Sequence, residues 1–236
     1  MKGLWSRVSL KEATERIRAR VGSPASSSSS SKSSAAAEVV RLGSSSPSLS
    51  GKKAAVLVPL FENESGEVSV WLTTRSSTKV STHKGEVSLP GGKAEDGETS
   101  VDTATREADE EVGISPARVE ILGQMTPILS KHGLVVTPVV STIPRDVVPR
   151  PRSEEVDVVF QAPLSTFLSS ENHRSSLWQH MGSPYTVHFF EFSDPADKRT
   201  HVIWGFTAYV LIEVARIVFA RDPLFPGDLR TPEQKL

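Results

Sequence analysis

Residues 98–114 carry the signals that begin and end a helix. Thr99 or Ser100 can cap the start, and Gly113 is a favourable terminator. Between these positions an apolar stripe recurs at helical spacing, formed by Val101, Ala104, Ala108 and Val112. Because two of its members are alanine, we expect this helix to pack closely against its neighbour. Any fold proposed for the chain has to bury this narrow stripe.

Three acidic side chains lie beside that stripe on one face of the predicted helix: Glu107, Glu110 and Glu111. Like charges three or four residues apart repel each other by about 0.2–0.5 kcal/mol per pair. Glu110 and Glu111 also stand in the last turn, where the helix dipole disfavours an anion by roughly 0.3–1 kcal/mol. Two local rules broken within one turn are typical of a functional site. A solvated acidic face is the ordinary alternative.

A divalent cation would turn this repulsion into attraction. Mg²⁺ favours carboxylate oxygens and keeps several waters, which leaves coordination positions for a substrate phosphate. Arg106 can pair with one carboxylate and hold its rotamer, although it cannot bind metal. The preceding Pro90, Gly91 and Gly92 end a strand and allow backbone to approach a ligand closely. Together these features favour metal binding over a solvated face.

The chain divides into four zones. Residues 1–22 are amphipathic and basic, which predicts either a helix packed on the domain or an organelle transit peptide. Serine fills 14 of the 28 positions from 23 to 50. We expect a flexible linker over 23–51, because such a segment buries too little apolar surface to offset its ordering entropy. Residues 52–222 form the predicted catalytic domain, and 223–236 a tail.

Apolar runs within the catalytic domain predict strands and two helices. The strands are expected at 54–61, 67–74, 119–124, 134–143, 155–160 and 185–192, and the helices at 100–112 and 206–220. The most hydrophobic stretch, 202–220, is interrupted by Glu213 and Arg216, so we interpret it as a buried helix rather than a membrane span. This order indicates a mixed sheet with helices on its faces, of the α/β or α+β class.

Composition excludes several functions. The formal net charge is −1, which gives no reason to expect a broad nucleic-acid surface and leaves a local basic pocket open. There is no cysteine, so disulfides, thiolate metal sites and cysteine nucleophiles are absent. The six histidines show no compact metal-ligand spacing. We therefore interpret each histidine as structural or solvent-exposed rather than as a metal ligand.

The acidic helix and the loop before it resemble the Nudix box, G-x5-E-x7-R-E-U-x-E-E-x-G-U, where U is a bulky aliphatic residue. At these positions the chain has Gly92, Glu98, Arg106, Glu107, Ala108, Glu110, Glu111, Gly113 and Ile114. Every fixed position matches, and Ala108 is smaller than the usual U residue.

The resemblance implies the Nudix fold, a mixed β-sheet sandwiched between α-helices, here with a flexible Ser-rich amino-terminal extension. It also implies Mg²⁺ or Mn²⁺ and cleavage of a nucleoside diphosphate linked to another group. Glu107 and Glu111 would be the principal metal ligands, and Glu110 a further ligand or a base. Glu98 and Arg106 would shape the loop and helix, with Gly113 structural in the motif.

A pyrophosphate is a poor electrophile because its oxygens repel an incoming nucleophile. Metal ions neutralise that charge, and a carboxylate can remove a proton from the attacking water. We expect Glu110 or Glu111 to contribute to this step, with Arg106 holding the catalytic arrangement. Glu155 is an alternative base from another strand, although a surface charge is the favoured interpretation of it.

A second resemblance is to the coenzyme A pyrophosphatase branch, which has the tract L-L-T-x-R-S-x3-R-x3-G-x3-F-P-G-G before its box. The chain matches both ends of this tract, at residues 71–76 and 85–92. One extra residue lies between them, and Ser81 stands where the branch has a second arginine. Leu89 replaces the phenylalanine. The run 202–208 also resembles this branch.

The implied reaction is hydrolysis of coenzyme A and acyl derivatives to 3′,5′-ADP and (acyl-)4′-phosphopantetheine. The substrate-binding residues would be Arg75, Lys84, Gly91 and Gly92. The loop that holds Arg75 and Lys84 also contains Lys79 and His83, which together suit a multiply phosphorylated substrate; a solvated loop is the alternative.

Two other functions stay open at this point. One is a Nudix pyrophosphatase for NADH or ADP-ribose, and the other is a Nudix-fold module that binds nucleotides without cutting them. In each case the partner is a small molecule, with no nucleic acid and no membrane span, and we allow for a homodimer. The weakly basic, Ser-rich amino terminus is consistent with a cytoplasmic or a mitochondrial location.

Overall fold

A computed structural model of the chain describes residues 8–21, 52–76, 85–130, 133–180, 183–196 and 198–225. Within this part, eight strands form a mixed sheet in which β3, β2, β1, β7 and β5 follow one another, with β4 on β1, β6 on β7 and β8 on β2. The strands are β1 (Lys53–Glu62), β2 (Val68–Arg75), β3 (Val87–Ser88), β4 (Gly91–Lys93), β5 (Glu120–Gln124), β6 (Ile128–Leu129), β7 (Val135–Thr142) and β8 (Val156–Pro163). Strands β1 and β7 run parallel and the other pairs antiparallel.

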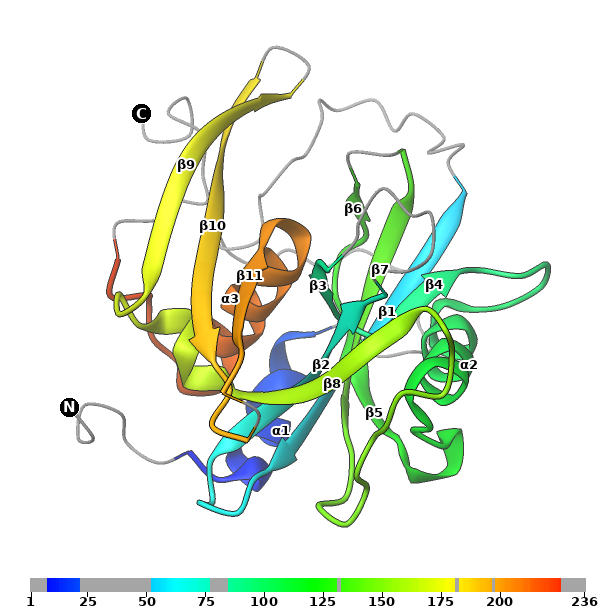
Figure 1. Cartoon of the computed structure of the whole chain (residues 1–236). Helices are drawn as coiled ribbons and strands as arrows, with labels where there is room; N and C mark the ends of the chain where they lie inside the picture. Colours follow the sequence, from blue (N-terminus) through cyan, green and yellow to red (C-terminus); the bar gives the residue numbers. More distant parts are fainter. Residues whose placement is uncertain are drawn as a thin grey trace.

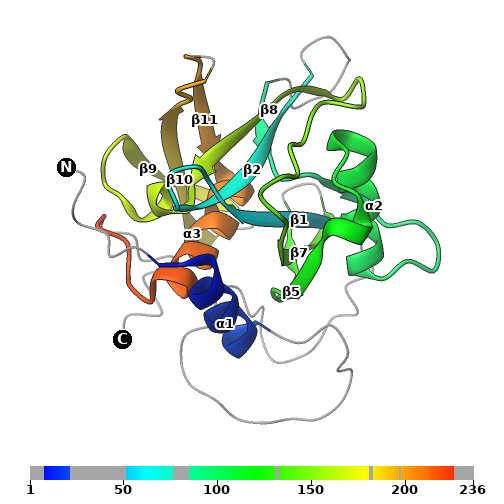
Figure 2. The same cartoon turned by 90° about the horizontal axis from the view of Figure 1, so that it is seen from below.

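Helix α2 (Ser100–Val112) covers one face of this sheet, as Figure 2 shows. Its Ala104 and Ala108 are fully buried and join a cluster with Ala55 and Leu57 of β1. The two alanines let helix and strand approach closely, as the sequence predicts, so α2 lies at a fixed position over the centre of the sheet.

The opposite face is covered by α3 (Gly205–Phe219) and by a second, antiparallel sheet. That sheet contains β9 (His173–His180), β10 (Ser183–Ser193) and β11 (Thr200–Trp204), with β10 in the middle. In Figure 1 the β9–β10 hairpin rises beside α3, away from α2. Buried side chains from both sheets and from α3 form the larger hydrophobic core.

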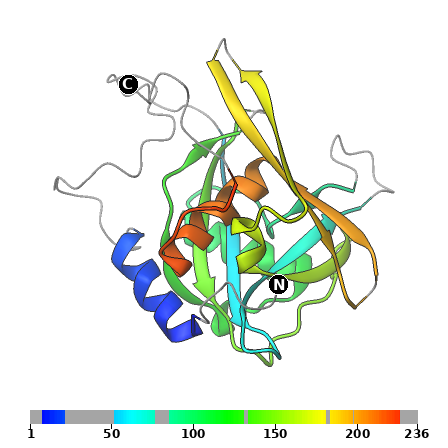
Figure 3. The ribbon, with the colours of Figure 1, turned by 90° about the vertical axis from the view of Figure 1, so that its left-hand side faces the viewer.

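Helix α1 (Leu10–Arg20) packs against α3, and Figure 3 shows the two helices side by side. Ser9 and Glu12 form a capping box at its start. Ala13 and Ile17 are fully buried in the larger core. The part of the amino-terminal zone that the structure describes therefore rests on the domain. The Ser-rich stretch 23–51 lies outside the described residues, as do 226–236, and the four-zone division stays a prediction.

The predicted fold class is confirmed, because a mixed sheet lies between helices. Each of the six predicted strands and both predicted helices of the domain has a counterpart in the structure. The interpretation of 202–220 as one helix is wrong at its start, because Val202–Trp204 belong to β11. Gly205, with φ 61, ends the strand and lets the chain turn into α3. Strands β3, β4, β6 and β9 and the short helices η1 (Pro116–Arg118) and η2 (Leu164–Leu168) were not predicted. The expectation that Gly91 and Gly92 end a strand is wrong, because both pair with β1 as part of β4.

Over the described residues, none of the helices has both the length and the apolar character that crossing a membrane requires.

Candidate active site

Helix α2 begins and ends at the residues that the sequence predicts. At its start the Thr99 hydroxyl accepts a hydrogen bond from the amide of Asp102 (3.2 Å), and the Asp102 carboxylate accepts one from the Thr99 amide (3.0 Å). At its end Gly113 adopts φ 74, and its amide donates to the carbonyls of Ala108 and Asp109. These caps fix both ends of the helix, and hence the position of the carboxylates on it.

The glycine pair of β4 lies directly on α2. A Cβ at Gly92 would stand 2.4 Å from a carboxylate oxygen of Glu107, and one at Gly91 would stand 2.3 Å from the carbonyl oxygen of Ala55. Only glycine permits this approach. It allows the Gly91 amide to donate a hydrogen bond to Oε2 of Glu111 at 3.2 Å. The backbone of the loop is thereby held against two of the predicted carboxylates.

Arg106 ties the loop after β4 to the helix. Its Nε donates to Glu98 at 2.6 Å, and its Nη2 donates to the carbonyl oxygen of Lys93 at 3.1 Å. Its Nη1 lies 3.2 Å from Glu107 and donates to Glu110 at 3.1 Å. The hydrogen bond from Arg106 lowers the pKa of Glu98 to about 2. One guanidinium thus orients three carboxylates, which agrees with the positioning role expected of it.

Glu111 is buried, with 8% of its surface exposed. Burial raises the pKa of Glu111 to about 7, while the hydrogen bond from Gly91 and the charge of Arg75 act in the opposite direction. Burial also raises the pKa of Glu107, against the ion pair with Arg106. The charge of Glu107 raises the pKa of Glu111 further. Additional positive charge at this place would stabilise both carboxylates in their ionised form.

Arg75 and Glu155 border the carboxylates from the adjoining ends of β2 and β8. Nη2 of Arg75 lies 3.8 Å from Oε2 of Glu155. The charge of Glu155 contributes to the raised pKa of both Glu107 and Glu111. The favoured interpretation from sequence is a surface charge, and the Glu155 side chain is indeed 60% exposed. Its electrostatic effect on the helix arises from the pairing of β2 with β8, which spacing along the chain does not reveal.

Two carboxylates, Glu107 and Glu111, meet the glycine loop, whereas Glu110 is 60% exposed and pairs with Arg106. In the part of the chain that the structure covers, no three His, Cys, Asp or Glu side chains form a group able to hold a metal ion. Mg²⁺ is often bound through only one or two carboxylates, with water and phosphate completing its shell. The oxygen donors of Glu107 and Glu111 therefore fit Mg²⁺ or Mn²⁺, and metal binding by Glu107, Glu110 and Glu111 stays a prediction.

Residues 150–152, which the sequence did not mark as part of the site, form hydrogen bonds with the C-terminal end of α2. The Arg152 amide donates to the carbonyl of Glu111 at 2.8 Å, and the Arg150 amide donates to that of Val112 at 3.0 Å. A Cβ at Gly113 would stand 2.4 Å from Nε of Arg152. The glycine at this box position thus serves a second purpose, since it gives the arginine room to cross the helix end.

Of the predicted substrate-binding residues, Arg75, Gly91 and Gly92 lie around the carboxylates. Lys84 lies outside the described residues, as do Lys79 and His83.

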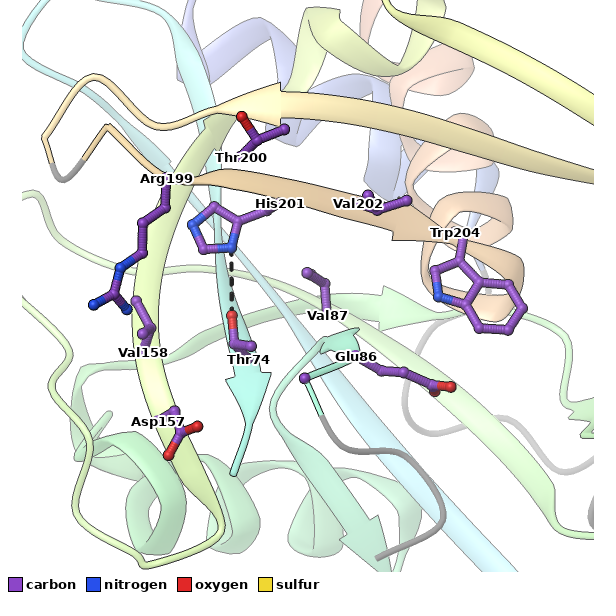
Figure 4. Close-up of a pocket in the computed structure, with 11 residues that line it drawn as sticks. Thr74, Glu86, Val87, Asp157, Val158, Arg199, Thr200, His201, Val202 and Trp204 are labelled. Atoms are coloured by element: carbon purple, nitrogen blue, oxygen red, sulfur yellow. Dashed lines mark hydrogen bonds between the residues drawn. The ribbon is translucent and has the colours of Figure 1, made fainter. Parts of the chain in front are cut away.

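A cavity of about 500 Å³ adjoins the ends of β2, β3, β8 and β11 (Figure 4). Its lining includes Thr74, Glu86, Asp157, Arg199, His201 and Trp204. The imidazole of His201 stacks on Phe160 with ring centroids 3.9 Å apart, and its Nδ1 lies 3.5 Å from the Thr74 hydroxyl. The sequence does not predict this cavity, because its residues come from separate segments. Only the resemblance of the run 202–208 pointed to part of it.

The model of the NUDIX domain matches residues 51–180. The chain is similar to two proteins of Arabidopsis thaliana, Nudix hydrolase 15, mitochondrial, and Nudix hydrolase 22, chloroplastic, each 47% identical over 74% of this chain. These matches cover 61% and 58% of the two relatives, so the chain spans about three fifths of their length. A third relative, peroxisomal coenzyme A diphosphatase NUDT7 of Mus musculus, is 35% identical over 79% of each chain.

Proposed function

We propose, since this chain belongs to the Nudix hydrolase family, that it hydrolyses the pyrophosphate bond of coenzyme A and its acyl derivatives. The products would be 3′,5′-ADP and (acyl-)4′-phosphopantetheine, and the reaction would use Mg²⁺ or Mn²⁺. The observation that carries the proposal is the pair Glu107 and Glu111, held against the backbone of Gly91 and Gly92 with both pKa values raised.

Glu107 and Glu111 are the residues that would hold the cation. When bound, it supplies positive charge to the pyrophosphate oxygens and makes water a stronger nucleophile. Arg106 keeps Glu107 and Glu110 oriented through its two contacts at 3.2 and 3.1 Å. Arg75 adds positive charge on the side where the substrate phosphates would lie.

Proton removal from water needs a carboxylate whose proton affinity suits neutral pH. Burial raises the pKa of Glu111 to about 7, and a bound cation would act in the opposite direction. Glu110 is the other candidate from the sequence, and its position beside Arg106 places it at the rim of the site. We therefore keep Glu110 and Glu111 as the two candidates for the proton acceptor, with Glu155 as the alternative from another strand.

Coenzyme A is proposed as the substrate on two grounds. The tract before the box resembles the coenzyme A branch at both ends, and the mouse relative is named a coenzyme A diphosphatase. The middle of the tract keeps the second candidate open, a pyrophosphatase for NADH or ADP-ribose, because Ser81 stands where the coenzyme A branch has an arginine.

A substrate panel tests the proposal. Coenzyme A, acetyl-coenzyme A, NADH and ADP-ribose are incubated with the full chain and Mg²⁺, with a parallel series in excess EDTA, and the products are read by mass. We expect 3′,5′-ADP and 4′-phosphopantetheine from coenzyme A, and no products with EDTA. Preferential cleavage of NADH would overturn the assignment of substrate. Tight nucleotide binding without any cleavage would identify a binding module instead.

The location that we propose is cytoplasmic or mitochondrial. One of the two Arabidopsis relatives is named as mitochondrial, which supports the second. Imaging of the full chain fused at its carboxyl end to a fluorescent protein, with sequencing of its mature amino terminus, tests this.

A further inference from the structure

Thr103 brings a hydroxyl to the buried side of α2 and is not one of the fixed positions of the Nudix box. The residue is 0% exposed, so water cannot replace the hydrogen bonds of this hydroxyl. Its Oγ1 lies 2.8 Å from Oε2 of Glu98 and 3.1 Å from the carbonyl oxygen of Thr99. The hydroxyl has one proton, and a hydrogen bond to a carboxylate is stronger than one to a carbonyl. The Thr103 proton therefore goes to Glu98.

The carboxylate of Glu98 accepts hydrogen bonds on both of its oxygens. Besides Thr103, Oε2 accepts from the Glu95 amide at 2.9 Å and from Nη2 of Arg106 at 3.1 Å, and Oε1 accepts from Nε of Arg106 at 2.6 Å. The Glu95 amide belongs to the same loop as Glu98, and Arg106 has a long side chain. Thr103 has a short, β-branched side chain with a stiff χ1. It is therefore the donor that ties this carboxylate most firmly to the body of α2.

The orientation of the Glu98 carboxylate decides where the third nitrogen of Arg106 lies. A guanidinium is planar and rigid, and its Nε and Nη2 are both bound to Glu98. The remaining Nη1 then stands 3.2 Å from Glu107 and 3.1 Å from Glu110. A rotation of the Glu98 carboxylate would carry the guanidinium plane with it and move Nη1 relative to both glutamates. The hydroxyl of Thr103 is thus linked to Glu107 through two side chains.

This link is separate from the contacts that hold α2 in place. The helix start is capped by Thr99 and Asp102, whose hydrogen bonds do not involve Thr103. The packing of α2 on β1 comes from Ala104 and Ala108. Loss of the Thr103 hydroxyl should therefore leave the helix in place and disturb only the orientation of Glu98 and Arg106.

We infer that Thr103 is a positioning residue for the proposed metal ligands and acts on them through Glu98 and Arg106. It contacts neither the substrate nor the cation, and it keeps the carboxylate of Glu107 in the orientation that suits the cation. This inference rests on the proposed function, because Glu107 and Glu111 are the residues that would hold the metal.

The test compares Thr103→Val with Thr105→Val on the same helix. The Thr105 hydroxyl bonds to the helix carbonyls of Val101 and Asp102, at 2.9 and 3.2 Å, so its loss removes a similar group without touching Glu98. Mn²⁺ binding to the full chain without substrate is measured through the electron paramagnetic resonance of the free ion. We expect Thr103→Val to raise the Kd for Mn²⁺ by about 3- to 10-fold, below the roughly 10- to 100-fold for a group that contacts a metal ligand directly. Thr105→Val and Thr103→Ser should stay within about twofold of the wild type.

Turnover of the preferred substrate gives a second readout. We expect the Mg²⁺ concentration for half-maximal turnover to rise in Thr103→Val by a similar factor, with the KM for substrate at saturating Mg²⁺ unchanged. A purely structural role would lower the fraction of folded protein without shifting the dependence on Mg²⁺.

Equal Mn²⁺ affinities of Thr103→Val and Thr105→Val would overturn the inference, and so would a wild type that binds no Mn²⁺. If Thr103→Val does not fold, as judged by circular dichroism, Thr103→Ser and Thr103→Ala replace it. These two differ only in the hydroxyl, and equal affinities would again reject the role.

Coenzyme A cleavage by the wild type separates the two proposals. Cleavage, with Mn²⁺ affinity independent of the hydroxyl at position 103, rejects the positioning role only. Absence of cleavage, with Mn²⁺ affinity that depends on this hydroxyl, rejects the proposed reaction only.

Discussion

Glu111 combines properties that a carboxylate rarely has in the last turn of a helix. Its side chain is 8% exposed, it accepts one backbone hydrogen bond from Gly91, and burial raises its pKa to about 7. Glu110, its neighbour on the chain, is 60% exposed and pairs with Arg106. Adjacent glutamates therefore have different environments, because successive residues on a helix point about 100° apart.

Replacement of Glu111 by Gln tests this residue. The amide keeps the size of the side chain but can neither take up a proton nor supply an anionic ligand. We expect turnover of the preferred substrate to fall by at least about 100-fold, the lower range for loss of a general base. The thermal midpoint should not fall, since a buried charge is removed.

The control for this change is Asp109→Asn on the same helix. Asp109 pairs with Arg152 at 3.1 Å and is not a fixed position of the box, so it should keep turnover within a few-fold of the wild type. A Glu111→Gln protein that turns over at the wild-type rate would remove Glu111 from the mechanism.

Helix α2 is capped at both ends, and the C-terminal cap, Gly113, sets the stricter limit on which residue can occupy the position. Its φ of 74 disfavours any residue with a Cβ, and a Cβ would also collide with Arg152. Gly66 has nearly the same φ, 73, but nothing within 4 Å of its Cβ position. Gly66 and Gly113 therefore form a matched pair. Alanine at Gly66 introduces backbone strain alone, whereas alanine at Gly113 adds the collision with Arg152.

We expect Gly66→Ala to lower the free energy of unfolding by about 1–2 kcal/mol, the cost of the left-handed conformation alone. Gly113→Ala should lower it further, because Arg152 has to move away from the helix end. Urea unfolding of both variants measures the difference. Equal losses would show that the arginine adapts without strain.

The elements that sequence predicted best are those whose pattern lies within one segment. Helix α2 is an example, since its caps, stripe and acidic face all occur within residues 98–114. Strand β11 was missed because Val202, Ile203 and Trp204 continue into the equally apolar α3, and Gly205 was the signal of the change. The cavity could not be predicted, because the sheets bring Thr74, Asp157 and Trp204 together from distant segments.

The whole molecule includes α1 as part of its core. Ile17 is fully buried within the same cluster as Leu211 of α3, and Arg16 donates to the carbonyl of Val218. We expect Ile17→Ala to lower the free energy of unfolding by about 2–5 kcal/mol, as for other buried aliphatic truncations. Glu15→Ala, on the exposed face, should change it by less than about 0.5 kcal/mol. Urea unfolding measures both losses. If Ile17→Ala lowered the free energy of unfolding as little as Glu15→Ala, the domain would be stable without the packing of α1.

Buried His188 links the second sheet to the segment that follows α3. Nε2 of His173 lies 2.9 Å from Nδ1 of His188, and the His173 ring stacks on Phe225 at 3.7 Å. Burial, together with the nearby His173, lowers the pKa of His188 to about 4. The folded protein therefore excludes a proton that the unfolded chain, with an ordinary pKa near 6.5, takes up.

The stability that His188 contributes is present above about pH 6.5 and is lost as pH falls toward 4. Because one pH unit of pKa difference is worth about 1.4 kcal/mol and part of it is screened by solvent, the loss is on the order of 1–3 kcal/mol. Urea unfolding at several pH values should show a shallower acid dependence for His188→Gln than for the wild type. If the free energy of unfolding of His188→Gln and of the wild type depended on pH in the same way, this prediction would be contradicted.

The parallel pairing of β1 with β7 also governs the order in which the molecule can form. Lys53 of β1 pairs with Val135 of β7, more than eighty residues later in the chain. The edge of β1 that faces β7 therefore stays uncovered until those residues have been synthesised. Its hairpin partner β2 emerges much earlier and occupies only the other side. Contacts so distant along the chain are slow to close, and an open strand edge invites association with other chains. A nascent chain arrested before β7 would thus display an uncovered strand, and the helix that carries Glu107 and Glu111 would still lack part of the sheet on which it packs.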